Sequence, residues 1–299
     1  MRLVTYTKDG ATCIGAIKDG AIVDFSGANG SLPADMLTLL QGGDALLETA
    51  RALVEETEAT IPLDEVTLQS PIPNPPRVLA VGINYMDHFL EIPEEVRTAK
   101  GLTAPKVPVV FNKQTESVTG PYAPVMAPPE SAQLDYEAEL AVVIGRTCRR
   151  VSAEDAHKVI MGYTILNDVS VRDWQLASMT MTMGKSWDSH CPMGPALVTA
   201  DEVTDPQNLQ VRLTVDGEEQ QNFNTGEMIF NIAQQIEYLS TACTLLPGDV
   251  IATGTSAGVA LFREGQPWLT AGQTVRVEIE GLGHIENQIE TDPGISFIQ

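Results

Sequence analysis

The chain has few basic residues for its length, and this shortage limits what it can bind. Among 299 residues there are 18 Lys and Arg against 40 Asp and Glu, so the formal net charge is −22. A field of this sign repels nucleic acids and anionic membranes, and we expect neither as a partner. An anionic substrate would need a cation supplied by particular residues or by a metal. The acidity equally fits a solubility role with no bearing on function.

Paired cysteines and long apolar runs are also lacking. Cys13, Cys148, Cys191 and Cys243 are widely separated and form no CxxC pair, which argues against a zinc ribbon or a disulfide framework. No apolar stretch is long enough to span a bilayer, and polar residues interrupt the first ten positions, where a signal peptide needs an apolar core. We therefore expect an unexported, cytoplasmic protein with reduced thiols.

The distribution of proline divides the chain in two. Residues 70–76, "SPIPNPP", contain four prolines and can continue neither a helix nor a central strand. Before them, short strand-like runs are followed by a helical pattern at 33–57, with apolar residues at three- and four-residue spacing. We predict a small N-terminal α+β domain, residues 1–72, and a larger domain, residues 73–299.

Strand-like runs dominate the larger domain. Only residues 152–165 and 230–245 have a helical pattern, and the first begins with Ser152 and Asp155 at capping spacing. The strand-like runs are "RVLAVG", "VPVVFNK", "ELAVVIG", "ALVTA", "LQVRLTVDG", "DVIATGT", "QTVRVEIEGLG" and "IENQIE". Many strands and few helices argue against βαβ alternation and predict a mixed, strand-rich α+β fold without repeats.

One strand-like run, "LDYEAELAVVIG", carries several carboxylates. Strand alternation places Asp135, Glu137 and Glu139 on one face. A solvated edge strand would explain them, but "LAVVIG" is apolar on both faces, as a buried strand is. Buried carboxylates repel unless they are protonated, paired with Arg or Lys, or bound to a divalent cation such as Mg²⁺, Mn²⁺ or Ca²⁺. Asp168, which follows another apolar run, is the best candidate for a third oxygen ligand.

Two further patterns suggest catalysis. His88 and Glu91 lie three residues apart, so in a helical turn the carboxylate orients the imidazole as a general base requires. A His–Glu pair on the protein surface, without a catalytic role, would have the same spacing.

Residues 88–108 have few apolar anchors, and we predict that they form a mobile lid. Lys185 is a candidate local cation, and the glycine-rich turn "TGTSAG" offers hydroxyl and backbone donors but lacks the spacing of a phosphate loop.

Together and in this order, these motifs resemble the fumarylacetoacetate hydrolase superfamily. The matching segments are "GINYMDHFLE", "PVVFNKQTESVTGP", "LDYEAELAVVIG", "GYTILNDVSVRDWQ", "GKSWDSHCPMGP", "LLPGDVIATGTSAGV" and "VRVEIEGLGHIEN", from about residue 76 to the end. The resemblance implies a homodimer, whose β-sandwich or β-roll catalytic domain follows a small N-terminal domain. It also implies that Glu137, Glu139 and Asp168 bind a divalent metal, with Mg²⁺ expected first, and that Asp135 lies outside the ligand set.

The activity implied by the resemblance is hydrolysis of a carbon–carbon bond in a 1,3-dicarbonyl substrate, such as an acylpyruvate. The metal would chelate the small anionic 2-oxo acid end and stabilise the enolate that leaves. His88, oriented by Glu91, would deprotonate the attacking water, and Lys185 would offset negative charge near the metal. Decarboxylation or isomerisation of a 2-oxo acid is the alternative within the family, and a silent binding or scaffold protein is the alternative outside it.

The resemblance also implies substrate contacts. Thr255 and Gly254 would hold a substrate carboxylate, and Gln175 would contact water or an oxyanion. Arg172 matches a position near the site, although a structural ion pair would equally explain it.

This chain departs from the family pattern at three places: the family's TGTPxGV reads "TGTSAGV", its GKSFDTF reads "GKSWDSH", and its GVGxxxxPP is replaced by "GVALFREGQPW". We expect these departures to change substrate choice and to leave the metal chemistry intact.

Overall fold

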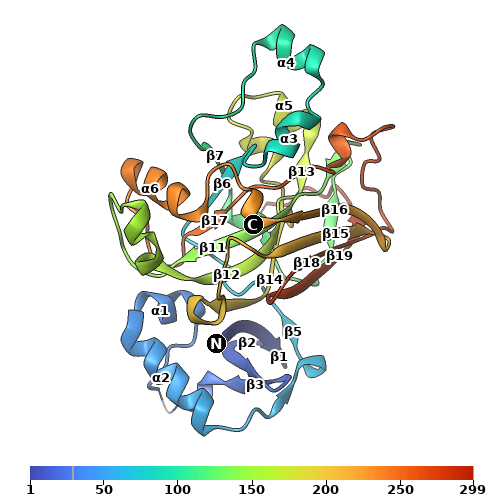
Figure 1. The fold of residues 1–299 in the computed structure, drawn as a ribbon. Coiled ribbons are helices and arrows are strands. Elements are labelled where there is room, and N and C mark those ends of the chain that lie inside the picture. The colour runs from blue at the N-terminus through green and yellow to red at the C-terminus, as the bar shows by residue number, and fades with distance from the viewer. Residues whose placement is uncertain (29, 299) are drawn as a thin grey trace.

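The N-terminal segment is a small antiparallel sheet covered by two helices (Figure 1). The computed structural model describes residues 1–28 and 30–298. This segment contains β1 (Arg2–Lys8), β2 (Ala11–Lys18), β3 (Ala21–Asp24), α1 (Met36–Gln41), α2 (Gly43–Glu56), β4 (Ile61–Pro62) and β5 (Thr67–Leu68). Asp–Gly turns at 9–10 and 19–20, with positive φ at all four residues, connect the first three strands.

The large sheet continues this small one without a break. Its order is β4-β3-β2-β1-β14-β12-β11-β17-β6-β7, with β5 paired to β1 and β8 paired to β14. The additional strands are β6 (Val78–Gly82), β7 (Val109–Lys113), β8 (Val118–Thr119), β11 (Ala138–Ile144), β12 (Ile160–Asn167), β14 (Cys191–Thr199) and β17 (Val250–Ala252). The join is made where Arg2 and Leu3 pair with Val198 and Leu197. The N-terminal helices also share a buried apolar core with β11 and β14, and a domain boundary at residue 72 stays a prediction.

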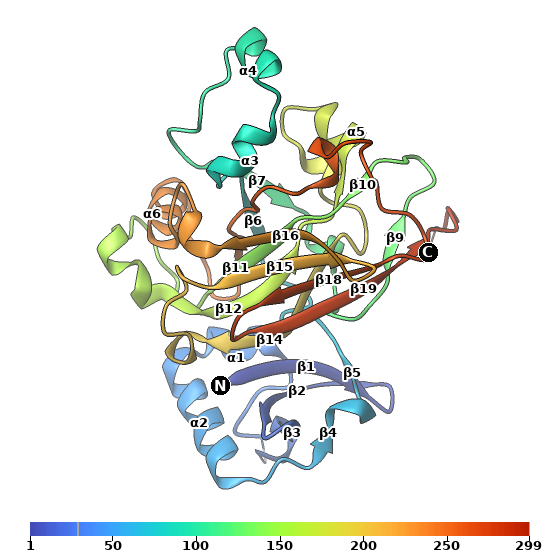
Figure 2. The same cartoon turned by 45° about the vertical axis from the view of Figure 1, so that its right-hand side comes forward.

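A second sheet packs against the large one. It has the order β16-β15-β18-β19-β9, and Figure 2 shows it in front of β11 and β12. Its strands are β9 (Val125–Ala127), β15 (Gln210–Val215), β16 (Glu218–Asn224), β18 (Thr274–Ile279) and β19 (Gly283–Thr291), and a short pair is formed by β10 (Leu134–Asp135) and β13 (Ser170–Val171). Apolar side chains of both sheets form one buried core, which includes Val142, Ile165, Leu213 and Val277. The strand-rich α+β sandwich predicted from the sequence is confirmed.

One helix prediction is half wrong. Residues 152–165 contain a 3₁₀ helix only over Ala153–Val159, capped by the Ser152 side chain on the Asp155 amide as predicted, and then enter β12. The strand lies between β11 and β14, where its apolar side chains are buried on both faces. Gly162 permits close pairing, because a Cβ atom there would lie 2.1 Å from the carbonyl oxygen of Val198. Burial in the middle of the sheet outweighed the local helical pattern.

The remaining helices lie around the large sheet. They are α3 (Met86–Glu91), α4 (Glu94–Lys100), α5 (Arg172–Leu176) and α6 (Ile232–Ala242). Figures 1 and 2 show α3, α4 and α5 together at the end of the molecule opposite the N-terminal segment, with α4 projecting furthest. Within the described residues, no helix combines the length and the apolar character that crossing a membrane requires.

Candidate active site

Three buried carboxylates converge at the ends of two neighbouring core strands. Glu137 and Glu139 flank the start of β11, and Asp168 follows β12, which pairs with β11. Each offers one oxygen, and these oxygens lie within 4.8 Å of one another. Asp135 was expected on the same strand face, but the strand is interrupted between β10 and β11. Its carboxylate instead accepts hydrogen bonds from Arg172 and from the Ala260 and Leu261 amides.

Three buried cations compensate these carboxylates. Lys185 Nζ lies 2.9 Å from Glu137 and 2.7 Å from Asp168, and Lys113 Nζ lies 2.6 Å from the other oxygen of Asp168. Arg172 bridges Asp135 at 2.8 Å and Glu137 at 2.7 Å, so it does form the ion pairs considered for it. Among the described residues, Glu139 has no ion-pair partner. Its oxygen accepts the Gly254 amide at 2.8 Å.

Burial and charge set the protonation of the cluster in opposite ways. Burial disfavours the Glu137 carboxylate, but Lys185 and Arg172 more than offset this and hold its pKa at about 2. Burial raises the pKa of Glu139 well above its ordinary value, and the negative charges of Asp168 and Glu137 raise it further. Burial opposes the charged Lys185, but Asp168 and Glu137 outweigh it and raise the pKa of this ammonium. Glu139 is therefore the carboxylate most in need of another cation.

The donor set fits a hard divalent cation. Four buried carboxylates, including Asp135, and three buried cations give a formal charge of 3 − 4 = −1. A divalent ion would change this to +1, which leaves the site attractive to an anionic substrate. Carboxylate oxygens are the ligands that Mg²⁺, Mn²⁺ and Ca²⁺ prefer. The residues Glu137, Glu139 and Asp168 can thus hold such an ion.

The His–Glu pair forms on α3 as its spacing predicts. His88 Nδ1 lies 2.8 Å from Glu91 Oε2, and both side chains are largely buried. Glu91 Oε1 accepts the Gly258 amide at 2.7 Å, so both carboxylate oxygens have a partner. Asn84 holds the segment before α3 by donating to the carbonyl oxygens of Thr253 and Phe230.

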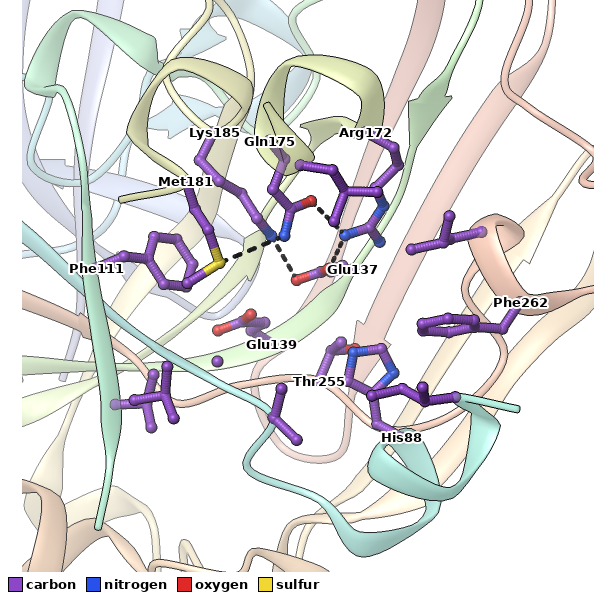
Figure 3. A pocket seen from close by; sticks show the side chains of 17 residues that line it. His88, Phe111, Glu137, Glu139, Arg172, Gln175, Met181, Lys185, Thr255 and Phe262 are labelled. Atoms are coloured by element: carbon purple, nitrogen blue, oxygen red, sulfur yellow. Dashed lines mark hydrogen bonds and ion pairs between the residues drawn. The ribbon is translucent and has the colours of Figure 1, made fainter. Parts of the chain in front are cut away.

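The carboxylate wall, formed by Glu137, Glu139 and Asp168, and the dyad wall, formed by His88 and Glu91, meet at one cavity of about 190 Å³ (Figure 3). The predicted residues that line it are His88, Glu137, Glu139, Arg172, Gln175, Lys185 and Thr255. The remaining predicted residues, Asp168, Glu91 and Gly254, lie behind this lining and bond to it. The Gly254 amide points to Glu139, which is a different contact from the substrate carboxylate expected for it.

One of the three departures in sequence lines this cavity, and a second is adjacent to it. Leu261 and Phe262 of the replaced "GVALFREGQPW" segment line the cavity, and Ser256, which stands where the family's TGTPxGV has proline, follows the lining residue Thr255. The Phe262 ring meets His88 edge to face at a centroid distance of 5.8 Å. Trp187 and His190 instead line a separate hollow beside Trp174, so the structure gives them no contact with the main cavity.

Sequence reasoning missed Lys113 as part of the site. This lysine is 2% exposed and donates to Asp168, to the Val169 carbonyl and to the Lys185 carbonyl. A lysine at the end of an apolar strand was the available signal, because burying an ammonium requires several acceptors.

Comparison with known proteins agrees with this geometry. Residues 77–290 match the model of the fumarylacetoacetate (FAA) hydrolase C-terminal family. The chain belongs to this family. It is 40% identical over 272 residues to oxaloacetate tautomerase fahd2, mitochondrial, of Xenopus laevis, a match that covers 90% of this chain and 83% of the relative.

Two solved structures extend the family likeness to the fold. The putative HpcE protein of Mycobacterium smegmatis superposes with a TM-score of 0.84 at 35% identity over 97% of this chain and 99% of that one. Maleylpyruvate hydrolase of Sphingobium sp. SYK-6, solved with manganese(II) and pyruvate, has a TM-score of 0.79 at 30% identity and the same coverage. The chain is an enzyme of this family, whose members are named as tautomerases, isomerases and hydrolases.

Proposed function

We propose that this enzyme catalyses the keto–enol tautomerisation of oxaloacetate. One observation carries the proposal: a single imidazole faces a cluster of buried carboxylates across a small cavity. Tautomerisation needs a site that holds the 2-oxo acid end and one acid–base group at the neighbouring carbon. The 40% identity to a relative named as an oxaloacetate tautomerase supports the same choice.

Proton transfer falls to the dyad. Because Glu91 accepts the Nδ1 proton of His88, the lone pair of Nε2 is left for the substrate. In the enol-to-keto direction the enol O–H bond breaks, a C–H bond forms at C3, and the double bond moves from C2=C3 to C2=O, so no atom is gained or lost. A divalent ion, for which we expect Mg²⁺, would when bound at Glu137, Glu139 and Asp168 polarise the 2-oxo group as a Lewis acid.

The remaining lining residues would orient the substrate. Arg172 lines the cavity, and its guanidinium charge would attract the second carboxylate of oxaloacetate. Thr255 offers its hydroxyl at the same cavity. Leu261 and Phe262 provide an apolar cover beside His88, which would exclude water from the reacting carbon.

Hydrolysis of an acylpyruvate is the second candidate. The 2.8 Å contact between His88 and Glu91 is the arrangement that activates a water as nucleophile. The 30% identity to a maleylpyruvate hydrolase adds support to this candidate.

Size-exclusion chromatography with light scattering would test the homodimer expected from the sequence.

A substrate panel distinguishes the candidates. Purified enzyme with Mg²⁺, and the same enzyme with chelator, is mixed with freshly dissolved enol-oxaloacetate and with acetylpyruvate. We expect rapid loss of enol absorbance without release of pyruvate or carbon dioxide, and no cleavage of acetylpyruvate. Release of two acids from acetylpyruvate would favour the hydrolase, and carbon dioxide from oxaloacetate would favour a decarboxylase.

A further inference from the structure

Gln221 lies on β16 behind the cavity, where its side chain connects the two catalytic walls. It is 1% exposed and does not line the cavity. Its Oε1 accepts the Ala138 amide at 2.9 Å. Its Nε2 donates to the Thr255 hydroxyl at 2.9 Å and to the Ser256 carbonyl at 3.0 Å. We infer that Gln221 is a positioning residue that fixes the carboxylate wall and the dyad wall relative to each other.

The first end of this connection is the backbone between two of the carboxylates. Ala138 separates Glu137 from Glu139, at the point where β11 begins after the interruption. The Glu137 amide there is satisfied by the Asn167 side chain, at 3.0 Å, and the Ala138 amide by Gln221. Side-chain amides therefore hold the peptide groups that orient both glutamates.

The second end is the loop that serves both walls. The Gly254 amide holds Glu139 at 2.8 Å, and the Gly258 amide holds Glu91 at 2.7 Å. Gln221 bonds to this loop between the two glycines. Proline is absent from the "TGTSAGV" turn, so these hydrogen bonds contribute to its restraint in place of a fixed φ angle. A shift of the loop would displace a carboxylate ligand and the orienting carboxylate of the dyad together.

Loss of such an outer contact has a measurable effect. Partners that orient metal ligands typically change metal affinity or activity by about 10–100-fold when removed. Gln221→Met removes every hydrogen bond and keeps the shape. Asn287→Leu is the matched control, because Asn287 is fully buried and donates to the carbonyl oxygens of three residues that do not line the cavity, Gly120, Pro121 and Ala123.

The experiment measures Mn²⁺ affinity by calorimetry and the imidazole signals by ¹H–¹⁵N NMR. We expect Gln221→Met to lose about 10–100-fold in Mn²⁺ affinity and to lose or shift the His88 Nδ1–H signal. The three other histidines should keep their signals. Asn287→Leu should lose similar thermal stability and keep both site properties. A folded Gln221→Met protein with wild-type Mn²⁺ affinity and His88 signal would overturn the inference.

A second variant covers the case in which Gln221→Met does not fold. Gln221→Glu keeps the length and the acceptor for Ala138 but loses the amide donors to the loop. The His88 signal should still change, and an unchanged signal with unchanged affinity would overturn the inference. The inference rests on the proposed function only through the metal and the dyad. A wild-type enzyme that fails to tautomerise oxaloacetate, while Gln221→Met still loses Mn²⁺ affinity, would refute the function and not the positioning role.

Discussion

The two walls of the cavity are built in opposite ways. The carboxylates come from the core sheet, are at most 6% exposed, and are held by buried lysines and an arginine. The dyad comes from the short helix α3, which has no side-chain N-cap and is followed by α4, in which no residue is buried. A rigid wall can hold concentrated charge at a fixed geometry, whereas α4, which continues the chain beyond the anchored dyad, has few anchors and can open for substrate. This difference suggests that the carboxylate wall binds the metal and the 2-oxo acid, and that the dyad wall transfers the proton.

The largest expected effect concerns the carboxylate wall. Glu137→Gln should lower metal affinity by more than the roughly 10–100-fold typical of an outer partner, because it removes a charged ligand. Asp135→Asn should instead cost roughly 3 kcal/mol of stability, since it breaks the buried pair with Arg172, and should affect metal affinity far less. Calorimetric titration and denaturant unfolding separate the two effects. Equal losses of affinity would contradict the assignment of Asp135 to a structural role.

The next largest effect concerns the dyad wall. Glu91→Gln should lower turnover by roughly 10²–10⁴, the usual contribution of general acid–base catalysis. Affinity for oxalate, a 2-oxo acid analogue, should hardly change. Because Glu91 acts by orienting His88, combining Glu91→Gln with His88→Ala should be little worse than the worse single change. Losses that multiply would show that the two residues act independently.

The raised pKa of Glu139 predicts how metal-free stability depends on pH. The folded protein retains a proton that the unfolded chain releases above the ordinary value of 4.5, so stability should fall as the pH rises from there towards the folded pKa. Glu139→Gln lacks this group and should show a flatter dependence. Thermal unfolding of the wild-type protein and of Glu139→Gln, both in chelator, is compared from pH about 5 to about 8. Parallel curves would rule out this origin for the pH dependence.

A smaller effect should appear in the mobility of the predicted lid, residues 88–108, in the part that lies beyond the anchored dyad and contains α4. Residues 92–108 should exchange amide hydrogens rapidly in the free enzyme and more slowly with metal and oxalate, if this segment closes over bound substrate. The strands β11 and β12 should be protected in both states. Mass-spectrometric exchange that is equal with and without oxalate over 92–108 would argue against a lid.

Residues in local patterns could be predicted from the sequence, whereas contacts between distant strands could not. The alternation of Glu137 and Glu139 and the His88–Glu91 spacing are local patterns, so these residues could be proposed from the sequence alone, and Asp168 could be proposed because it follows an apolar run. The contacts of Lys113 and Gln221 depend on strands distant in sequence, and no spacing rule encodes them. Residues 160–165 were predicted as helix although they belong to β12, because the burial of this strand on both faces follows from neighbours that only the sheet supplies. Local chemistry was predictable, and long-range support was not.

The claim that the carboxylate wall binds and the dyad wall transfers the proton is tested most directly by the decay of enol-oxaloacetate with His88→Ala enzyme saturated with Mn²⁺. Calorimetry first establishes that this variant binds Mn²⁺ as tightly as the wild type. We expect the enol then to decay at nearly the uncatalysed rate, as it should with wild-type enzyme in chelator. Decay at the wild-type rate with metal-saturated His88→Ala would contradict this claim, because proton transfer would then not require the dyad wall.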